Sequence, residues 1–257
     1  MFTNSLKMIV ALLVGVVAAG AWGIEGRAEE PGVVKAAEKH KVVKFKMTLI
    51  VDNMGMPRPT DDKTLMYADV KAPRCRREEK SNSFGVIDVD WLLILDGKKK
   101  LGLNVLTEKI ADGVKEDDEK LALAKKEGCP RKDAKLFRLK EEYADDPIKH
   151  SRPLLEVFQE LEKHKDAVVT KEKLDGKEAV KYYREDGKKT YQLWVDAKTK
   201  LPLQYQWENL DPKITWVFSD FEWDPKLPTG FKDLDALFDT TPPKGYKLDD
   251  LTKKDNK

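Results

Sequence analysis

Two cysteines, Cys75 and Cys129, carry the most reactive side chains of this chain. In a protein that leaves the cytoplasm, an even pair of cysteines favours a disulfide. A Cys75–Cys129 bridge would close a loop of about 54 residues and stabilise the fold by roughly 4 kcal/mol in the chain-entropy model. The sequence does not fix the distance between the two sulfurs, so two separate thiols remain the alternative.

Other groups with chemical potential do not form a constellation. The three histidines, His40, His150 and His164, lack the spacing of metal ligands. Asp88 and Asp90 alternate along an expected strand, where they would face a cation, a sugar or simply solvent. The sequence has no Gly-x-Ser-x-Gly elbow and no glycine-rich phosphate loop. We therefore predict no enzyme activity, no metal and no cofactor.

The composition favours one globular domain beneath a highly charged surface. Of the 257 residues, 40% are hydrophobic and 37% are charged. The formal net charge is only +2, whereas a nucleic-acid-binding protein usually carries a clustered basic excess. We predict a single domain over residues 41–248 and no nucleic-acid partner.

The N-terminus has the proportions of a secretory signal peptide. Lys7 precedes an apolar run that starts at Met8 and ends at the small residues Ala19-Gly20-Ala21. An uncleaved membrane anchor is the alternative, but it needs roughly 20 apolar residues and this run is shorter. We predict cleavage after residues 1–21, a flexible start over 22–40 or a short helix from Val33 to Lys39, and an exported, periplasmic protein that is soluble once cleaved.

Period-two alternation of apolar residues predicts a long series of antiparallel strands. The clearest pair joins a strand ending at Asp196 to a return strand that starts at Pro202. Asp-Gly pairs at 96–97, 175–176 and 186–187 are typical of tight hairpin turns. We predict further strands over residues 42–51, 64–70, 87–95, 101–105, 167–184 and 214–218, with a loop over 53–60.

One amphipathic helix interrupts the strands. Residues 151–165 begin with a capping Ser151 and place Leu154, Val157, Phe158 and Leu161 on one stripe, which must be buried. We interpret residues 111–149 as a charged, solvated insertion with a short helix over 118–127, and residues 249–257 as a charged tail. The predicted fold class is mainly β (α+β), an unclosed antiparallel β-barrel or strongly curved sheet with the helix in or over its concave face.

Three segments together resemble a known superfamily. They are Leu193-Trp-Val-Asp-Ala-Lys-Thr-Lys-Leu-Pro-Leu203, then Phe218-Ser-Asp-Phe-Glu-Trp223, then Phe238 with Pro242-Pro-Lys-Gly-Tyr246. In order and spacing, over about residues 150–248, they resemble the periplasmic lipoprotein-carrier superfamily of the LolA, LolB and RseB proteins. The resemblance implies an unclosed β-barrel that holds acyl chains between the barrel and a helical lid.

The same resemblance suggests candidate site residues. Carriers have an arginine after a proline on an early strand that latches the lid, and Arg74, Arg76 and Arg77 follow Pro73 here. The aromatic residue expected beside that arginine is absent, so the sequence does not say which of the three matches. If the helix lies as a lid, a hydrophobic cavity is expected; if it fills the barrel, the same side chains are core. The candidate cavity residues are Phe45, Met47, Leu49, Trp91, Leu154, Phe158 and Leu161.

Two functional hypotheses follow. The first is a periplasmic binding protein that holds lipid or lipoprotein acyl chains. The second is an envelope sensor or protein-interaction module that uses the same fold to contact a membrane protein, without carrying lipid. Both rest largely on analogy, because one fold hosts many functions.

Overall fold

The computed structural model describes residues 32–53, 56–59, 64–141, 154–211 and 213–256. All of them belong to one compact unit, Pro31–Lys257. They form one unclosed sheet of 13 strands, in the order β13-β7-β6-β5-β4-β3-β1-β12-β11-β10-β9-β8, with β2 paired to β1 beside this path. The expected signal peptide, residues 1–21, lies outside the described residues, as does most of residues 22–40 up to Pro31.

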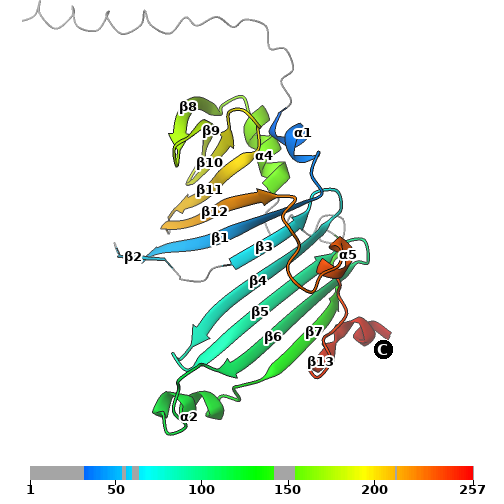
Figure 1. The fold of residues 1–257 in the computed structure, drawn as a ribbon. Helices are drawn as coiled ribbons and strands as arrows, with labels where there is room; N and C mark the ends of the chain where they lie inside the picture. Colours follow the sequence, from blue (N-terminus) through cyan, green and yellow to red (C-terminus); the bar gives the residue numbers. More distant parts are fainter. Residues whose placement is uncertain (1–31, 54–55, 60–63, 142–153, 212, 257) are drawn as a thin grey trace, which may run out of the picture. The chain divides into compact units, whose positions relative to one another are not determined.

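The strands run through the whole described chain (Figure 1). The first seven are β1 (Val42–Asn53), β2 (Met56–Pro59), β3 (Thr64–Asp69), β4 (Arg74–Ser83), β5 (Ile87–Asp96), β6 (Leu101–Ile110) and β7 (Lys132–Arg138). The others are β8 (Val168–Leu174), β9 (Lys177–Asp186), β10 (Lys189–Asp196), β11 (Pro202–Leu210), β12 (Lys213–Trp223) and β13 (Lys247–Asp250).

The described helices are short and lie between the strands. They are α1 (Val33–Ala37), α2 (Glu119–Lys126), α4 (Leu154–Lys163), α5 (Leu234–Leu237) and the terminal 3₁₀ helix η2 (Leu251–Asn256). Asp118 caps α2, because its side chain accepts a hydrogen bond from the Lys120 amide. The helices predicted near residues 33, 118 and 154 are therefore confirmed, although the expected cap at Ser151 lies outside the described residues.

The predicted fold class is confirmed: the protein is mainly β, the sheet does not close, and an amphipathic helix packs on one face. One pairing departs from an antiparallel sheet, because β13 runs parallel to β7. The pairing lets the chain return after a long crossover from β7 to β13, which a tight hairpin cannot provide.

Three segments expected to be irregular are in the sheet. The loop predicted over residues 53–60 contains β2, which pairs with the end of β1. The predicted solvated insertion over 111–149 contains β7, which pairs with β6 and β13. The predicted tail over 249–257 begins inside β13 and continues as η2. β7 and β13 have backbone partners from a distant part of the chain, and β2 is short and carries two prolines, so local alternation of apolar residues gives no signal for any of them.

The sequence pattern did not predict β4 either, because its residues show no alternation of apolar and polar side chains. Its residues, Arg-Cys-Arg-Arg-Glu-Glu-Lys-Ser-Asn-Ser, are almost all polar. It nevertheless pairs with β5 along its full length, from Arg74 opposite Asp96 to Ser83 opposite Ile87. Two flanking strands supply its hydrogen bonds, and this overrides a weak intrinsic preference.

The register divides the sheet into two faces, because successive strand residues point to opposite sides. Phe45, Met66 and Arg77 lie on the face that α4 covers, which we call the α4 face. Val42, Tyr67 and Arg76 lie on the opposite face, covered by α5 and its neighbours Phe231 and Phe238, which we call the α5 face. The α4 face is where the candidate residues lie.

Candidate functional site

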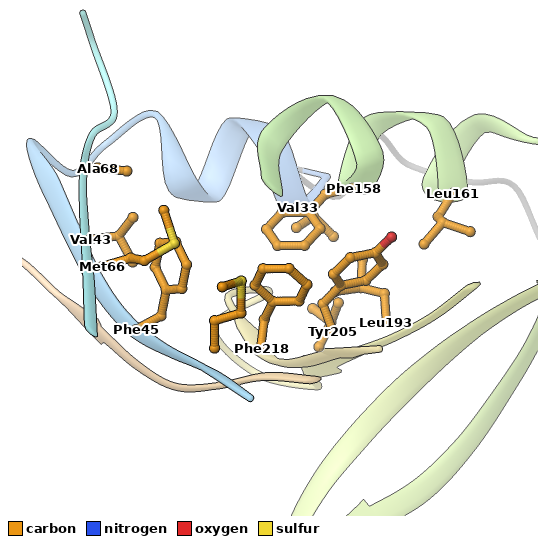
Figure 2. Packing of buried hydrophobic residues seen from close by; sticks show 12 residues of the cluster. Val33, Val43, Phe45, Met66, Ala68, Phe158, Leu161, Leu193, Tyr205 and Phe218 are labelled. Atoms are coloured by element: carbon orange, nitrogen blue, oxygen red, sulfur yellow. The ribbon is translucent and has the colours of Figure 1, made fainter. Parts of the chain in front are cut away.

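The first part of the α4 face, which we call the covered region, is closed by helices. Phe158 and Leu161 from α4 and Val33 from α1 point toward the sheet (Figure 2). Buried apolar and aromatic side chains of the strands pack against them. These are Val43, Phe45, Met47, Met66, Ala68, Leu193, Val195, Tyr205 and Phe218, all at most 7% exposed.

Aromatic contacts fill the interior of the covered region. The Phe158 ring lies 6.1 Å from Tyr205 and 6.3 Å from Phe221, edge-on to both. Phe45 stacks on Phe221 at 5.4 Å between ring centroids. Edge-on and offset contacts of this kind are the favoured aromatic geometries. The helix and the sheet therefore meet as a packed core.

Glu160 and Glu162 connect α4 to neighbouring elements by polar contacts. Glu162 accepts a hydrogen bond of 3.0 Å from the Val33 amide at the start of α1. Glu160 forms an ion pair of 2.5 Å with Arg184 on β9. Glu160 is largely exposed, and an exposed ion pair contributes little. Among the described residues of α4, Phe158 and Leu161 hold the helix on the sheet by apolar contact.

The second part of the α4 face, over β4 to β7 and β13, is not covered by α4. We call it the open region. The strand register arranges its side chains in two rows across five strands. One row is Arg77, Leu93, Asn104, Lys135 and Asp249, and the other is Glu79, Trp91, Leu106, Asp133 and Lys247.

Trp91 stands at the centre of the open region. Its side chain is 47% exposed, which is unusual for a tryptophan on an interior strand. The indole Nε1 donates a hydrogen bond to the Asn104 side-chain oxygen on β6. That bond fixes the orientation of the ring, so the indole is presented to solvent in one pose.

Two hollows adjoin Trp91 and Asn104. The larger has a volume of about 380 Å³ and extends over β6, β7 and β13 as far as Lys247 and Asp249. The smaller has a volume of about 150 Å³ and is bounded by Arg77, Glu79 and Leu93. The larger volume falls in the range of roughly 300–1,000 Å³ that is typical of ligand sites.

Apolar clusters close the open region at both ends of its strands. At one end, Phe137 lies over Gly102 and packs with Leu95 and Leu139. At the other end, Leu121 and Ala124 of α2 pack on the strand start, where the buried residues are Val86 and Ile87. The rows around Trp91 therefore rest on a rigid floor that is anchored on either side.

Of the three latch candidates, Arg74 is the buried one. Its guanidinium pairs with Asp69 at 2.6 Å and with Asp235 of α5, and lies 5.0 Å above the Phe238 ring. Burial lowers the pKa of Arg74, but hydrogen bonds to Asp235 and Asp69 outweigh it, so the net pKa is raised. Arg74 thus fastens α5 to the sheet, on the face opposite α4.

Arg76 and Arg77 point to opposite faces of the sheet, because the side chains of successive strand residues alternate. Arg76 points to the α5 face, where it pairs with Glu78, donates to the Leu237 carbonyl at 3.3 Å and lies over Phe231. Arg77 points to the α4 face and pairs with Glu79 at 2.7 Å in the open region. Among the three, Arg74 and Arg76 hold the C-terminal segment, and none touches α4 in a contact of the described residues.

The predicted Cys75–Cys129 bridge is absent from the structure. Cys75 lies opposite Leu95 near the end of β5, whereas Cys129 packs beside Ile87 at its start. The eight residues between these points span about 26 Å of strand, and a disulfide needs Cα atoms within about 7 Å. Burial raises the pKa of the Cys129 thiol, and Glu108 raises it further, so this thiol is protonated at neutral pH.

The structure separates the seven predicted cavity residues. Phe45, Met47, Phe158 and Leu161 meet in the covered region. Leu49 lies further along β1, opposite Trp216, and Leu154 is the first residue of α4. Trp91 lies apart from the other six residues, in the open region on β5.

Other expected sites have ordinary structural surroundings. Asp88 and Asp90 lie on the face opposite Trp91, where Asp88 accepts a hydrogen bond from Asn82 and Asp90 lies 4.0 Å from Lys80. His40 pairs with Asp224 at 2.9 Å, and its ring lies tilted against Trp223 at 5.2 Å between ring centroids. Within the described ranges, no three metal-ligating side chains come together.

Comparisons with known proteins find similarity in structure but not in sequence. The complex of MucA and MucB from Pseudomonas aeruginosa contains a chain similar to this one at 15% identity and a TM-score of 0.26, covering 77% of this chain and 56% of that one. A domain from Vibrio parahaemolyticus, assigned to outer membrane lipoprotein sorting, matches at 11% and 0.25, covering 79% and 95%.

PNGF-II is another similar structure, at 8% identity and a TM-score of 0.32, and the match covers 84% of this chain and 33% of that one. The chain thus spans a third of PNGF-II and little more than half of MucB. No family model and no curated protein matches the chain. Since every identity is below 25% and every TM-score below 0.5, the site is argued from its own residues.

The two-row arrangement of the open region was not predicted from the sequence. Six of its ten residues come from β4, β7 and β13, which local alternation does not predict. The available signal was the mixture of Leu92 and Ile94 with Trp91 and Leu93, which shows that both faces of β5 carry apolar residues. In the described part of the chain, no helix is both long and apolar enough to cross a membrane.

Proposed function

We propose that this chain is an exported binding protein that holds an acyl chain of a lipid or lipoprotein between α4 and the sheet. The observation that carries the proposal is the construction of the covered region. An amphipathic helix rests on an aromatic sheet face through Phe158 and Leu161, and its described polar contacts are those of Glu162 with Val33 and of Glu160 with Arg184. An acyl chain would replace contacts that are themselves apolar, so little is lost when the helix moves aside.

In this proposal, the packed arrangement of α4 on the sheet is the form that must open to admit a ligand. Phe158 and Leu161 occupy the space that an acyl chain would take. Binding therefore requires α4 to separate from Phe45 and Tyr205 while the sheet stays in place. Displacement of an amphipathic helix is a standard way to open such a site, and its energy must come from ligand contacts.

The direct test locks the helix. Glu160→Cys and Arg184→Cys, made together in a chain with Cys75→Ser and Cys129→Ser, place one thiol on α4 and one on β9 at an existing contact. A short bis-maleimide then joins them. Delipidated protein should take up a fluorescent fatty acid before crosslinking and lose that uptake after it. The uncrosslinked double variant is the control.

A negative result is equally informative. If neither form binds the fatty acid, and mature protein from a membrane-containing host carries no lipid in native mass spectrometry, acyl-chain binding is excluded. If both forms bind equally, the ligand does not enter beneath α4. Either result removes the proposed site.

An envelope interaction module is the second candidate, and the edge strand β8 supports it. Among the described strands β8 pairs with β9 alone, and Val168 and Val169 on it are 56% and 52% exposed. An open edge accepts an extended segment of a partner chain by strand addition. Crosslinking in envelope extracts, repeated with Val169→Lys, tests it: a specific adduct that the substitution abolishes supports the module, and its absence excludes this edge.

A further inference from the structure

The open region has features that an acyl-chain site does not need. A hydrocarbon chain is best held in a closed apolar channel, whereas this region is shallow and has a charged residue at every outer position of its rows. Its apolar content is confined to Trp91, Leu93 and Leu106 in the middle. The chemistry is therefore that of a partly polar ligand with one apolar side.

The charges of the open region cancel strand by strand. Each of β4, β7 and β13 contributes one cation and one anion to the two rows. These pairs are Arg77 with Glu79, Lys135 with Asp133, and Lys247 with Asp249. A surface whose charges cancel in this way does not attract a polyanion or a polycation from a distance. It does offer donors and acceptors at short intervals, which suits a neutral ligand rich in hydroxyl groups.

Trp91 supplies the apolar platform for such a ligand. Its exposed indole is held in one pose by Asn104, so little conformational entropy is lost when a ligand packs on the ring. Aromatic side chains with one apolar face and nearby polar groups are effective contact residues because they bury area at low entropic cost. The C–H face of a sugar ring matches that surface.

The extent of the rows defines the size of the ligand. Five strands, spaced about 4.8 Å apart, span about 19 Å from β4 to β13. The two hollows lie on either side of Trp91 and Asn104 along this line. A linear oligosaccharide is long enough to use both, whereas a single sugar reaches only one.

We infer that the open region is a carbohydrate-binding surface for a neutral linear oligosaccharide, with Trp91 as the stacking platform. Hydroxyl groups on the edges of the sugar rings hydrogen-bond to Arg77 and Glu79 on one side and to Lys135 and Asp133 on the other. Asn104 is a positioning residue, because it holds the indole. This surface does not depend on α4 movement or on acyl-chain binding.

The experiment uses the mature chain and three neutral probes, maltohexaose, cellohexaose and chitohexaose, measured by isothermal titration calorimetry. At least one probe should bind, and Trp91→Ala should weaken that binding about tenfold or more, because a stacking contact and its buried area are lost. Trp91→Phe should retain most of the affinity. Phe84→Ala, which removes an exposed aromatic outside the hollows, is the matched control and should bind as the wild type does.

Intrinsic fluorescence identifies the contact independently of the fold of any variant. Binding to the wild type should shift tryptophan emission to shorter wavelength, since the exposed indole loses water. The shift should disappear in Trp91→Phe although calorimetric binding persists. A fatty acid added beforehand should leave oligosaccharide binding unchanged.

The inference is overturned if no probe binds at millimolar concentration, if Trp91→Ala binds as the wild type does, or if heparin binds in place of the neutral probes. Loss of fatty-acid binding in the crosslinked form described above would leave this result untouched. The two proposals therefore fail separately.

Discussion

The covered and open regions lie on the same face of one sheet, but their aromatic side chains differ in exposure to solvent. In the covered region, Phe45, Phe158 and Tyr205 are at most 2% exposed, whereas Trp91 in the open region is 47% exposed. The difference follows the cover: α4 excludes water from the first, and no described helix crosses the centre of the second. Buried aromatics build stability, and an exposed, oriented aromatic is available for a ligand.

The strands beneath the two regions differ in the polarity of the side chains that they place on this face. The face is almost wholly apolar across β1, β10, β11 and β12, but β4 and β7 bring charged residues to it. A helix can cover the apolar surface, whereas covering the charged surface would remove its charges from water at a high cost in free energy. The comparison predicts that truncating a buried aromatic in the covered region lowers the free energy of unfolding far more than truncating the exposed Trp91 in the open region.

The largest effect is expected for Phe158→Ala. The side chain is completely buried, so its removal leaves a cavity and should lower the free energy of unfolding by about 3–5 kcal/mol. Trp91→Ala is the matched aromatic truncation in the open region and should cost well under half as much. Urea denaturation followed by circular dichroism measures both. Equal losses would remove the distinction between the regions.

Arg74→Leu should be nearly as damaging, although it lies on the opposite face. The substitution leaves the Asp69 carboxylate buried without its cation, at a cost of about 3 kcal/mol or more. Arg77→Leu in the open region is the control, because its ion pair with Glu79 is partly exposed and contributes less than about 1 kcal/mol. Thermal unfolding of the two variants compares them. Similar melting temperatures would contradict the assignment of Arg74 as the fastening residue.

Gly102→Ala tests the apolar cluster that closes one end of the open region. A Cβ atom at this position would meet the Phe137 ring at 2.4 Å, so the ring must move and stability should fall by about 1–3 kcal/mol. The double variant Gly102→Ala/Phe137→Leu should show a non-additive loss, since the smaller side chain relieves the clash. Strict additivity in chemical denaturation would show that the two residues are not in contact.

The smallest effect concerns pH and the β10–β11 turn in the covered half of the sheet. Hydrogen bonds from the Thr199 amide, the Thr199 hydroxyl and the Lys198 amide lower the pKa of Asp196. This group therefore stabilises the fold fully above its unfolded pKa of about 3.9, and its contribution is lost as the pH falls through the lower folded value. Asp196→Asn should be less stable than the wild type at neutral pH, and the gap should narrow below pH about 4.

Denaturation midpoints measured for Asp196→Asn and the wild type over a pH series check this sign. A gap that widens on acidification would mean that the carboxylate is not the stabilising form.

The sequence alone determined the elements whose partners are close in the chain. Period-two alternation and Asp-Gly turns predicted β5 with β6, β8 with β9, and β10 with β11, because a hairpin needs only local signals. The stripe of Phe158 and Leu161 predicted a helix with one buried face, and α4 has that face. The choice between lid and core could not be made, since it depends on how closely side chains from distant strands pack.

Tertiary structure decided everything that depends on pairing across a long stretch of chain. β7 and β13 pair with strands distant in the chain, and β4 is a polar strand held between β3 and β5. Only the register of the whole sheet aligns Arg77, Trp91, Asn104 and Lys135 in the open region. The same register places Cys75 and Cys129 near opposite ends of β5, where no disulfide can form. Residue type and spacing specify local conformation, but the order of strands in a sheet fixes which distant side chains become neighbours.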